Sequence, residues 1–137
     1  MSRVTYRVAE VAVRVADLEL AVAFYRDVLG FLPHKSEPGV VFLEIGALDT
    51  PLGRGGHPQL LALFAPGEAV HVGTSSLDHI AFEIPASVYD AELARYTGMG
   101  MVIHERAWPE SLPWQGRSFF FRDPEGNVIE LIAAHRE

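Results

Sequence analysis

The chain contains an internal repeat whose offset is about half of its length. Residues 10–15 read Glu-Val-Ala-Val-Arg-Val, and residues 79–84 read His-Ile-Ala-Phe-Glu-Ile. Both runs are typical of strands, both begin with a potential metal ligand, and they start 69 residues apart (10 to 79) in a chain of 137. Since each copy of a repeat forms the same supersecondary unit, the chain is predicted to fold into two similar modules.

The first half shows a strand, a helix and further strands. A strand ends near Val15, and Asp17 is a suitable N-cap for an apolar helical pattern that Gly30 stops. Short apolar strands follow at residues 40–45 and 59–64. Module one is therefore expected to cover about residues 1–68.

The second half repeats this plan. A strand at residues 79–84 precedes a helix that runs through about Tyr96, and Ser87 with Asp90 resembles a capping box at its start. Further strands are predicted at residues 101–105, 118–122 and 128–133, with a tight turn at residues 123–127. Module two is expected at about residues 77–137, and the two modules form a single α+β domain.

Composition limits the classes of function. Apolar residues make up 49% and charged residues 21%, as in ordinary globular domains. The net charge of −7 argues against nucleic acid as a partner, because such binding depends on clustered Lys and Arg. Cysteine is absent, which excludes disulfides and Cys-based zinc sites. No apolar run approaches the ~20 residues of a membrane span, and the N-terminus lacks a signal-peptide core. We therefore expect a cytoplasmic protein without membrane contact.

The repeat offset predicts where a site is assembled. Shifting Glu130 back by 69 residues gives Leu61, so Glu10, Leu61, His79 and Glu130 become quasi-equivalent positions. If the modules pack as a pseudo-symmetric pair, these positions meet at a shared cavity. Glu10, His79 and Glu130 then offer two carboxylates and one imidazole, which suit Mn²⁺, Fe²⁺, Ni²⁺ or Zn²⁺. The alternative is that Glu10 and His79 form a hydrogen bond or ion pair.

Substrate contacts are expected from a loop at residues 108–116. Trp108 and Trp114 flank this proline-bearing stretch, and aromatic residues at a cavity rim commonly line small-molecule pockets. Leu61 is expected to face the same cavity. The alternative for the two tryptophans is that they cap the core. His57 and His104 are interpreted as surface or structural residues.

Three stretches resemble the vicinal oxygen chelate superfamily, which includes glyoxalase I, extradiol dioxygenases and the fosfomycin- and bleomycin-resistance proteins. They are Val11-Ala-Val-Arg-Val-Ala-Asp-Leu18 with Ala23-Phe-Tyr-Arg-Asp-Val-Leu-Gly-Phe31, Leu77-Asp-His-Ile-Ala-Phe82, and Phe121-Arg-Asp-Pro-Glu-Gly-Asn-Val-Ile-Glu-Leu131. The resemblance implies two βαβββ modules that form an open, cupped mixed sheet around a small-molecule site. It also implies a homodimer.

The resemblance also assigns roles by position. Glu10 replaces the usual first metal histidine, while His79 and Glu130 match the second histidine and the closing glutamate. Leu61 stands where many glyoxalases have a glutamate, so a glyoxalase proton shuttle lacks one carboxylate. Phe120 replaces the tyrosine of extradiol dioxygenases, and residues 111–116 lack their upstream histidine. Glyoxalase I and catechol dioxygenase activities are therefore not expected.

Two hypotheses follow for the function. The first is a metal-dependent enzyme, without an organic cofactor, that acts on a small substrate with vicinal oxygens. The residues name neither its reaction nor its substrate, and they leave open whether the modules pair within a chain or between chains. The second is a metal-free binding protein for a drug or metabolite, of the bleomycin-resistance type.

Overall fold

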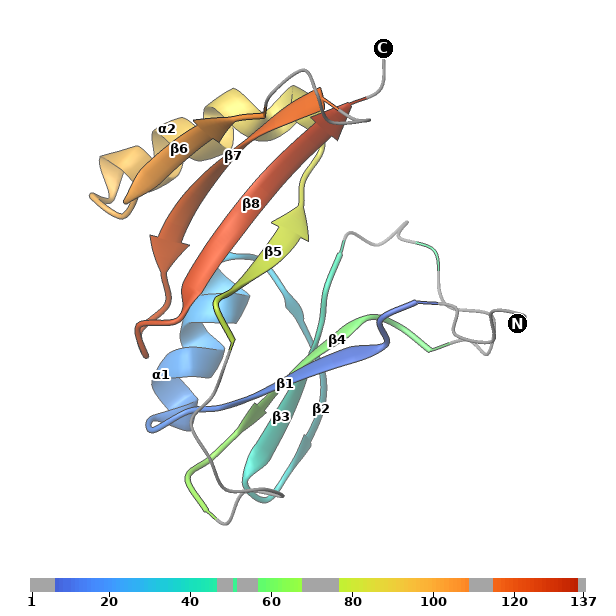
Figure 1. Cartoon of the computed structure of the whole chain (residues 1–137). Coiled ribbons are helices and arrows are strands. Elements are labelled where there is room, and N and C mark those ends of the chain that lie inside the picture. Colours follow the sequence, from blue (N-terminus) through green and yellow to red (C-terminus); the bar gives the residue numbers. More distant parts are fainter. Residues whose placement is uncertain (1–6, 47–50, 52–56, 68–76, 109–114, 136–137) are drawn as a thin grey trace. The chain divides into compact units, whose positions relative to one another are not determined.

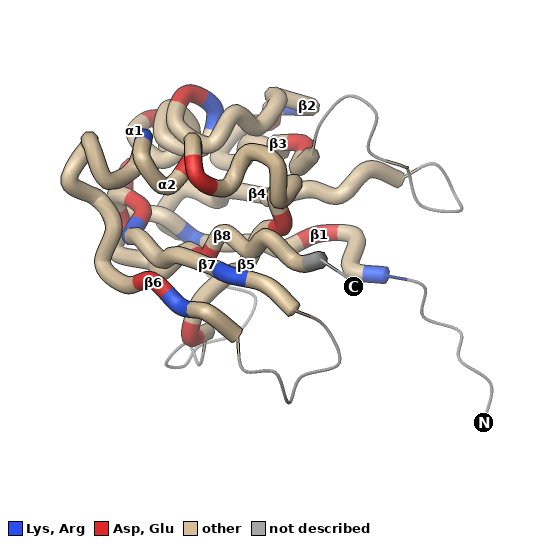
Figure 2. Tube along the Cα trace, turned by 90° about the horizontal axis from the view of Figure 1, so that it is seen from above, with Lys and Arg blue, Asp and Glu red and all other residues tan. Residues whose placement is uncertain are grey.

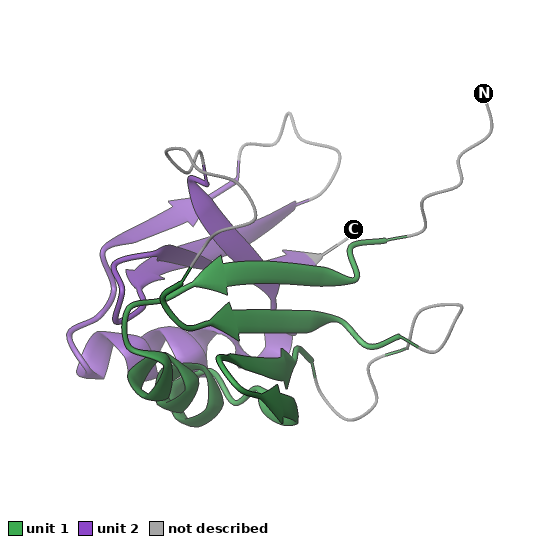
Figure 3. Cartoon of the chain, turned by 90° about the horizontal axis from the view of Figure 1, so that it is seen from below, with its two compact units in different colours: residues 1–72 green, residues 73–137 purple. Residues whose placement is uncertain are grey.

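The computed structural model describes residues 7–46, 51, 57–67, 77–108 and 115–135 (Figure 1). The chain divides into two compact units, Met1–Val72 and Gly73–Glu137 (Figure 3). Each unit carries a four-stranded sheet with strands of both directions and open edges. The predicted α+β class with two βαβββ modules is therefore confirmed.

The first unit has the strand order β1-β4-β3-β2, with β1 parallel to β4 and the other neighbours antiparallel. Its elements are β1 (Glu10–Arg14), α1 (Leu18–Ala23), a π-helical turn η1 (Phe24–Val28), β2 (Leu32–Glu37), β3 (Val40–Glu44) and β4 (Leu60–Phe64). Asp17 caps α1 as predicted, because its Oδ1 accepts a hydrogen bond from the Leu20 N–H at 3.0 Å. Gly30, at a φ of 80°, ends the helical segment.

The second unit repeats this topology with the order β5-β8-β7-β6, and β5 is parallel to β8. Its elements are β5 (His79–Glu83), a 3₁₀ turn η2 (Ala86–Val88), α2 (Tyr89–Gly98), β6 (His104–Ala107), β7 (Gln115–Arg122) and β8 (Val128–His135). Its core joins helix to sheet through aromatic rings. Tyr96 on α2 lies 4.5 Å from Phe121 and 5.4 Å from Phe119, between ring centroids.

A tight turn sets the register of β7 against β8. Asp123 Oδ1 accepts hydrogen bonds from the N–H groups of Glu125 and Asn127, at 2.9 and 2.8 Å. Gly126 has a φ of 87°, which glycine adopts without the strain that a Cβ would cause. The turn places Phe120 directly opposite Glu130. The predicted turn is confirmed, and it fixes the position of Glu130 opposite Phe120.

The register of the two parallel pairs corrects the repeat by one residue. Glu10 on β1 pairs with Leu60 on β4, and His79 on β5 pairs with Val128 on β8. The first strands of the two units are therefore 69 residues apart in sequence (10 to 79), and the last strands are 68 apart (60 to 128). The hydrogen bonds agree, since Val15 N–H donates to Phe64 O and Ile84 N–H donates to Ile132 O, each at 2.8 Å. The counterpart of Glu130 is therefore Ala62, and the predicted equivalence with Leu61 is wrong.

The one-residue shift reverses the face of the sheet, because side chains alternate along a strand. Ala62 shares the face of Glu10, whereas Leu61 pairs with Val11 and lies on the other face. Both residues are fully buried.

Two further expectations from sequence need correction. Ser87 does not cap α2, because the cap position is Val88 and no side chain there bonds to the helix; a 3₁₀ turn leads into the helix instead. The strand β2 was not predicted, and all six of its residues are exposed.

The described part of the chain carries acidic and basic residues interspersed along its trace (Figure 2). Among the helices in that part, none has the length and apolar character needed to cross a membrane.

Candidate functional site

The sheet of the second unit has two chemically different faces. One carries Phe119 and Phe121, whose rings contact Tyr89 and Tyr96 of α2. The opposite face is here called the His79 face, and its residues follow from strand alternation and register. They are His79, Ala81 and Glu83 on β5, Val128, Glu130 and Ile132 on β8, Ser118 and Phe120 on β7, and His104 and Arg106 on β6. This face therefore carries two histidines, two glutamates, an arginine and a serine on the side away from α2.

His79 lies between two carboxylates on this face. Its Nε2 is 3.0 Å from Glu130 Oε1, and its Nδ1 is 2.7 Å from Asp78 Oδ2. The Glu130 side chain is 7% exposed, the His79 ring 34% and the Asp78 side chain 94%. A buried carboxylate, an imidazole and a solvated carboxylate thus form one chain of hydrogen bonds.

The two carboxylates favour the charged imidazole. The hydrogen bond to Asp78 is the largest influence that raises the pKa of His79, and burial opposes it, while Glu130 adds a smaller contribution in the same direction as Asp78. A neutral imidazole has only one N–H and donates to one carboxylate, whereas the protonated ring donates to both. The ring is therefore oriented along a fixed line between Asp78 and Glu130.

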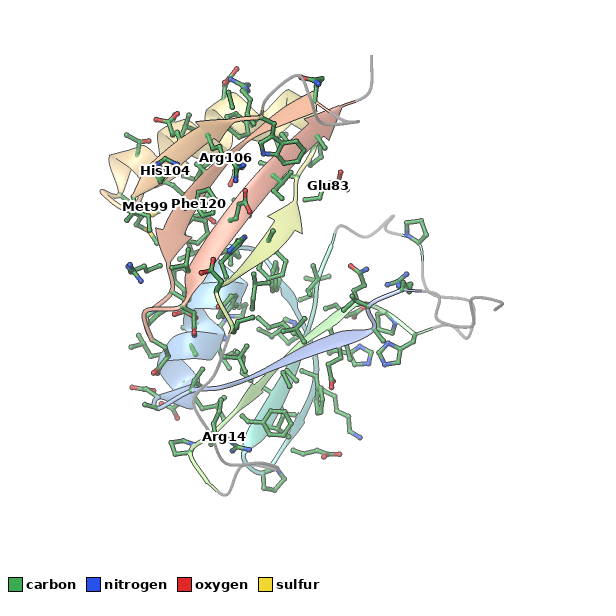
Figure 4. The ribbon with its side chains drawn as sticks, viewed as in Figure 1. Arg14, Glu83, Met99, His104, Arg106 and Phe120 are labelled. Atoms are coloured by element: carbon green, nitrogen blue, oxygen red, sulfur yellow. The ribbon has the colours of Figure 1, made fainter. Side chains whose placement is uncertain are left out.

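Phe120 lies beside this chain. Its ring centroid is 5.6 Å from that of His79, edge to face, and also 5.6 Å from that of His104. His104 therefore lies on the His79 face and contacts Phe120, although it is exposed. Figure 4 shows Phe120, His104 and Arg106 on β7 and β6, with Glu83 across the sheet on β5. Phe120 supplies an apolar surface where a tyrosine would supply a hydroxyl.

Trp108 packs at the far end of the same face. A Cβ built on Gly116 would lie 3.2 Å from Trp108 Cε3 and 2.6 Å from the Ala133 carbonyl oxygen, so this position has no room for a side chain. The Trp108 N–H also donates to the Gly116 carbonyl at 3.0 Å. Its ring is half-buried against the sheet. Trp114 lies outside the described residues.

The predicted metal ligands fall in different units. His79 and Glu130 meet in the second unit, whereas Glu10 is exposed at the first position of β1 in the first unit. Ala62, and not Leu61, lies on the Glu10 face. Neither residue has a donor atom for a metal, so the expectation that this fourth position lacks a ligand still holds.

Asp78, Arg106 and Ser118 were not singled out from the sequence. Asp78 could have been predicted, because it directly precedes the candidate ligand His79 and a carboxylate is a suitable partner for the second ring nitrogen of such a histidine. Arg106 and Ser118 could not have been predicted, since their shared face depends on the register of β6 against β7.

Comparison with known proteins identifies the family of the chain. A family model described as the Glyoxalase/Bleomycin resistance protein/Dioxygenase superfamily matches residues 7–131. Among solved structures, lactoylglutathione lyase from Agrobacterium tumefaciens is 26% identical, with a TM-score of 0.72 and 96% of each chain covered. No match to a curated protein was found.

The genomically encoded fosfomycin resistance protein FosX from Listeria monocytogenes shares the fold. It is 23% identical, with a TM-score of 0.63 and coverage of 94% of this chain and 93% of FosX. A mutant of FosX, 22% identical with a TM-score of 0.62, was solved with Mn(II) and 1S,2S-dihydroxypropylphosphonic acid; the match covers 94% of this chain and 93% of the mutant. With its two βαβββ units and a family match over residues 7–131, the chain belongs to the Glyoxalase/Bleomycin resistance protein/Dioxygenase superfamily.

Proposed function

We propose that the protein is a metal-dependent enzyme that acts on a small substrate with vicinal oxygens, with Glu10, His79 and Glu130 as the ligands of one divalent ion. Mn²⁺, Fe²⁺, Ni²⁺ and Zn²⁺ suit this donor set, because imidazole binds these ions better than it binds Mg²⁺. The protein works without an organic cofactor and as a homodimer. A mutant of FosX, which has the same fold, was solved with Mn(II) and a ligand that carries two vicinal hydroxyls.

The observation that carries this proposal is the contact between His79 and Glu130. An imidazole nitrogen and a carboxylate oxygen would both bind one divalent ion only if they lie close to each other. The distance from His79 Nε2 to Glu130 Oε1 is 3.0 Å. His79 and Glu130 would therefore supply two of the donor atoms of one ion.

Asp78 supports the same role. It accepts from His79 Nδ1 and so leaves Nε2 as the metal-binding nitrogen, an arrangement common among metal-bound histidines. Glu130 is nearly buried, and a cation would compensate the cost of keeping its charge away from water. Both features therefore support His79 and Glu130 as ligands of a divalent ion.

A bound divalent ion would supply Lewis-acid chemistry, polarising the substrate oxygens and stabilising developing negative charge. The residues of the chain bind and orient. Phe120 offers its ring to the apolar body of the substrate, and Trp108 and Trp114 are proposed to contact it farther along. On the first unit, Ala62 replaces Leu61 as the proposed substrate-facing position.

Divalent metal is expected to raise the melting temperature of the wild type. At a metal concentration of about 100 times Kd, mass action stabilises the native state by about 2.7 kcal/mol, which corresponds to about 10 °C for a domain of this size. His79→Ala should abolish this rise. Differential scanning fluorimetry with Mn²⁺, Ni²⁺ and Zn²⁺ after EDTA treatment measures it.

Matched variants separate ligation from general effects. His34→Ala is the control for His79, because His34 also contacts a carboxylate, that of Glu44, at 3.1 Å. Glu10→Gln should reduce the thermal shift, with Glu19→Gln on α1 as its control. A wild type that does not respond to any of the three ions, or a His34→Ala variant that loses the response equally, contradicts the proposal.

A metal-free binding protein of the bleomycin-resistance type is the second candidate. The observation in its favour is that no group of three His, Cys, Asp or Glu side chains in the described residues is arranged to hold a metal. Asp78 binds the opposite nitrogen of the His79 ring and so does not add to the pair with Glu130. In this case the hydrogen-bonded chain orients an organic ligand directly.

We expect no cleavage of catechols. Phe120 lies 5.6 Å from His79, between ring centroids, where it offers no hydroxyl for acid–base chemistry. Catechol incubated with Fe²⁺-loaded, anaerobically prepared protein and then with oxygen should give no yellow ring-cleavage product by absorbance. Product formation above that of free Fe²⁺ would show that another residue supplies the missing group.

A further inference from the structure

The His79 face carries an arginine that has no hydrogen bond or ion pair with any described residue. Arg106 on β6 is exposed and stands directly opposite Ser118 on β7. Within the described residues it is the only arginine that makes neither a hydrogen bond nor an ion pair. The others bond to carbonyl oxygens or carboxylates, for example Arg117 to Asp90 at 3.0 Å and Arg122 to the Gly126 carbonyl at 3.0 Å. None of the five donors of the Arg106 guanidinium is therefore taken up by a described residue.

Ser118 carries a buried hydroxyl group. The residue is 0% exposed, and its Oγ has no hydrogen-bond partner in the part of the chain that the structure describes. Buried polar groups are satisfied in most proteins, because an unpaired one costs about 1–3 kcal/mol. An unsatisfied group of this kind therefore needs an explanation, such as a catalytic role or a bound water or ion.

From this juxtaposition, we propose that Arg106 and Ser118 form a subsite for a small oxyanion, a carboxylate or phosphate group of the ligand. Planar guanidinium binds such groups through two parallel hydrogen bonds, and the Ser118 hydroxyl donates a third. His104, two residues before Arg106 on the same face, provides a ring nitrogen on the side toward Phe120. The inference rests on the proposed function, because the subsite and the proposed metal ligands His79 and Glu130 lie on the same face and would bind the same substrate.

The strand geometry limits the size of this ligand. Arg106 is two strands and two residues away from Glu130, which at spacings of about 4.8 Å and 3.4 Å places their Cα atoms about 12 Å apart. Phe120 lies between them. The ligand is therefore a compact anionic molecule with oxygens at His79 and Glu130 and its charged group at Arg106.

Oxyanion binding to EDTA-treated full-length protein tests the subsite independently of metal. Inorganic phosphate and acetate are titrated separately, with calorimetry for affinity and ¹⁵N NMR for the amides of β6 and β7. Wild type should bind at least one of them, and the tighter anion identifies the class of charged group. Arg106→Gln should weaken binding about tenfold or more, because a charge-assisted pair is lost. Ser118→Ala should weaken it several-fold without lowering the melting temperature.

Arg117→Gln is the matched control, since Arg117 lies on the α2-facing side of the same sheet, where it pairs with Asp90 and stacks on Tyr89. It should bind both anions as the wild type does. No binding by the wild type, equal affinity for Arg106→Gln, or an equal loss in Arg117→Gln overturns the subsite. The thermal shift with Mn²⁺ reports separately on the metal proposal, so either proposal can fail while the other stands.

Discussion

Ala62→Glu is expected to make the stability of the protein depend on metal. Ala62 is fully buried and takes the place in the first unit that Glu130 takes in the second. A buried carboxylate without a partner costs about 3–5 kcal/mol, so the variant should be strongly destabilised in EDTA. Because this position corresponds to a fourth ligand, Mn²⁺ should restore most of the loss. Urea denaturation with EDTA and with Mn²⁺ measures both effects.

Leu61→Glu is the matched control for this variant. Leu61 is equally buried but lies on the face opposite Glu10, next to Val11. Its carboxylate should destabilise by a similar amount in EDTA, and Mn²⁺ should give no greater recovery than it gives the wild type. If Mn²⁺ rescues Leu61→Glu and leaves Ala62→Glu unstable, the position derived from the repeat offset is right and the one derived from strand register is wrong.

His79→Ala is expected to destabilise the metal-free protein by about 2 kcal/mol. The change leaves Glu130 buried without its hydrogen-bond partner. The loss is smaller than for a fully buried pair because the His79 side chain is 34% exposed. A double variant with Glu130→Leu as well should recover stability. His34→Ala, which breaks an exposed pair, should cost less than about 1 kcal/mol. Equal losses of stability in His79→Ala and His34→Ala would contradict the claim that His79 compensates the buried charge of Glu130.

The same pair predicts a dependence of stability on pH. The pKa of His79 is raised, mainly by the hydrogen bond to Asp78, so folding favours the protonated ring. This contribution is fully present below the ordinary histidine pKa of about 6.5 and is lost as pH rises through the raised value. The stability difference between wild type and His79→Ala should therefore shrink as pH rises above the ordinary histidine pKa of about 6.5. A difference that grows over this range would contradict the pairing.

The sequence predicted the architecture because its main signals are local. The Asp17 cap, the Gly30 stop and the turn at residues 123–127 act through nearby backbone groups, and all three are present. The capping box at Ser87 is absent because a 3₁₀ turn enters α2 instead. Strand β2 gave no signal, since Leu32–Glu37 is exposed throughout and contains a proline and several polar residues.

The candidate site was predicted in part. His79 and Glu130 were singled out because both occur in recognisable motifs, and the structure places His79 Nε2 3.0 Å from Glu130 Oε1. The shift from Leu61 to Ala62 was not predictable, because a repeat offset does not reveal a one-residue difference between the halves. Arg106 and Ser118 become neighbours only through the pairing of β6 with β7. Such pairing depends on turn geometry and on the buried face of the sheet.

The most direct test of the metal proposal is to count bound ions by electron paramagnetic resonance of Mn²⁺, whose free form gives a strong signal in solution. The wild type, purified without a His-tag and treated with chelator, should bind about one Mn²⁺ per chain, a stoichiometry set by one ligand group. Glu130→Gln should lose this binding, and Asp78→Asn should keep it with about 10- to 100-fold weaker affinity, as for other partners of metal-bound histidines. A wild type that binds no more Mn²⁺ than Glu130→Gln would contradict the metal site.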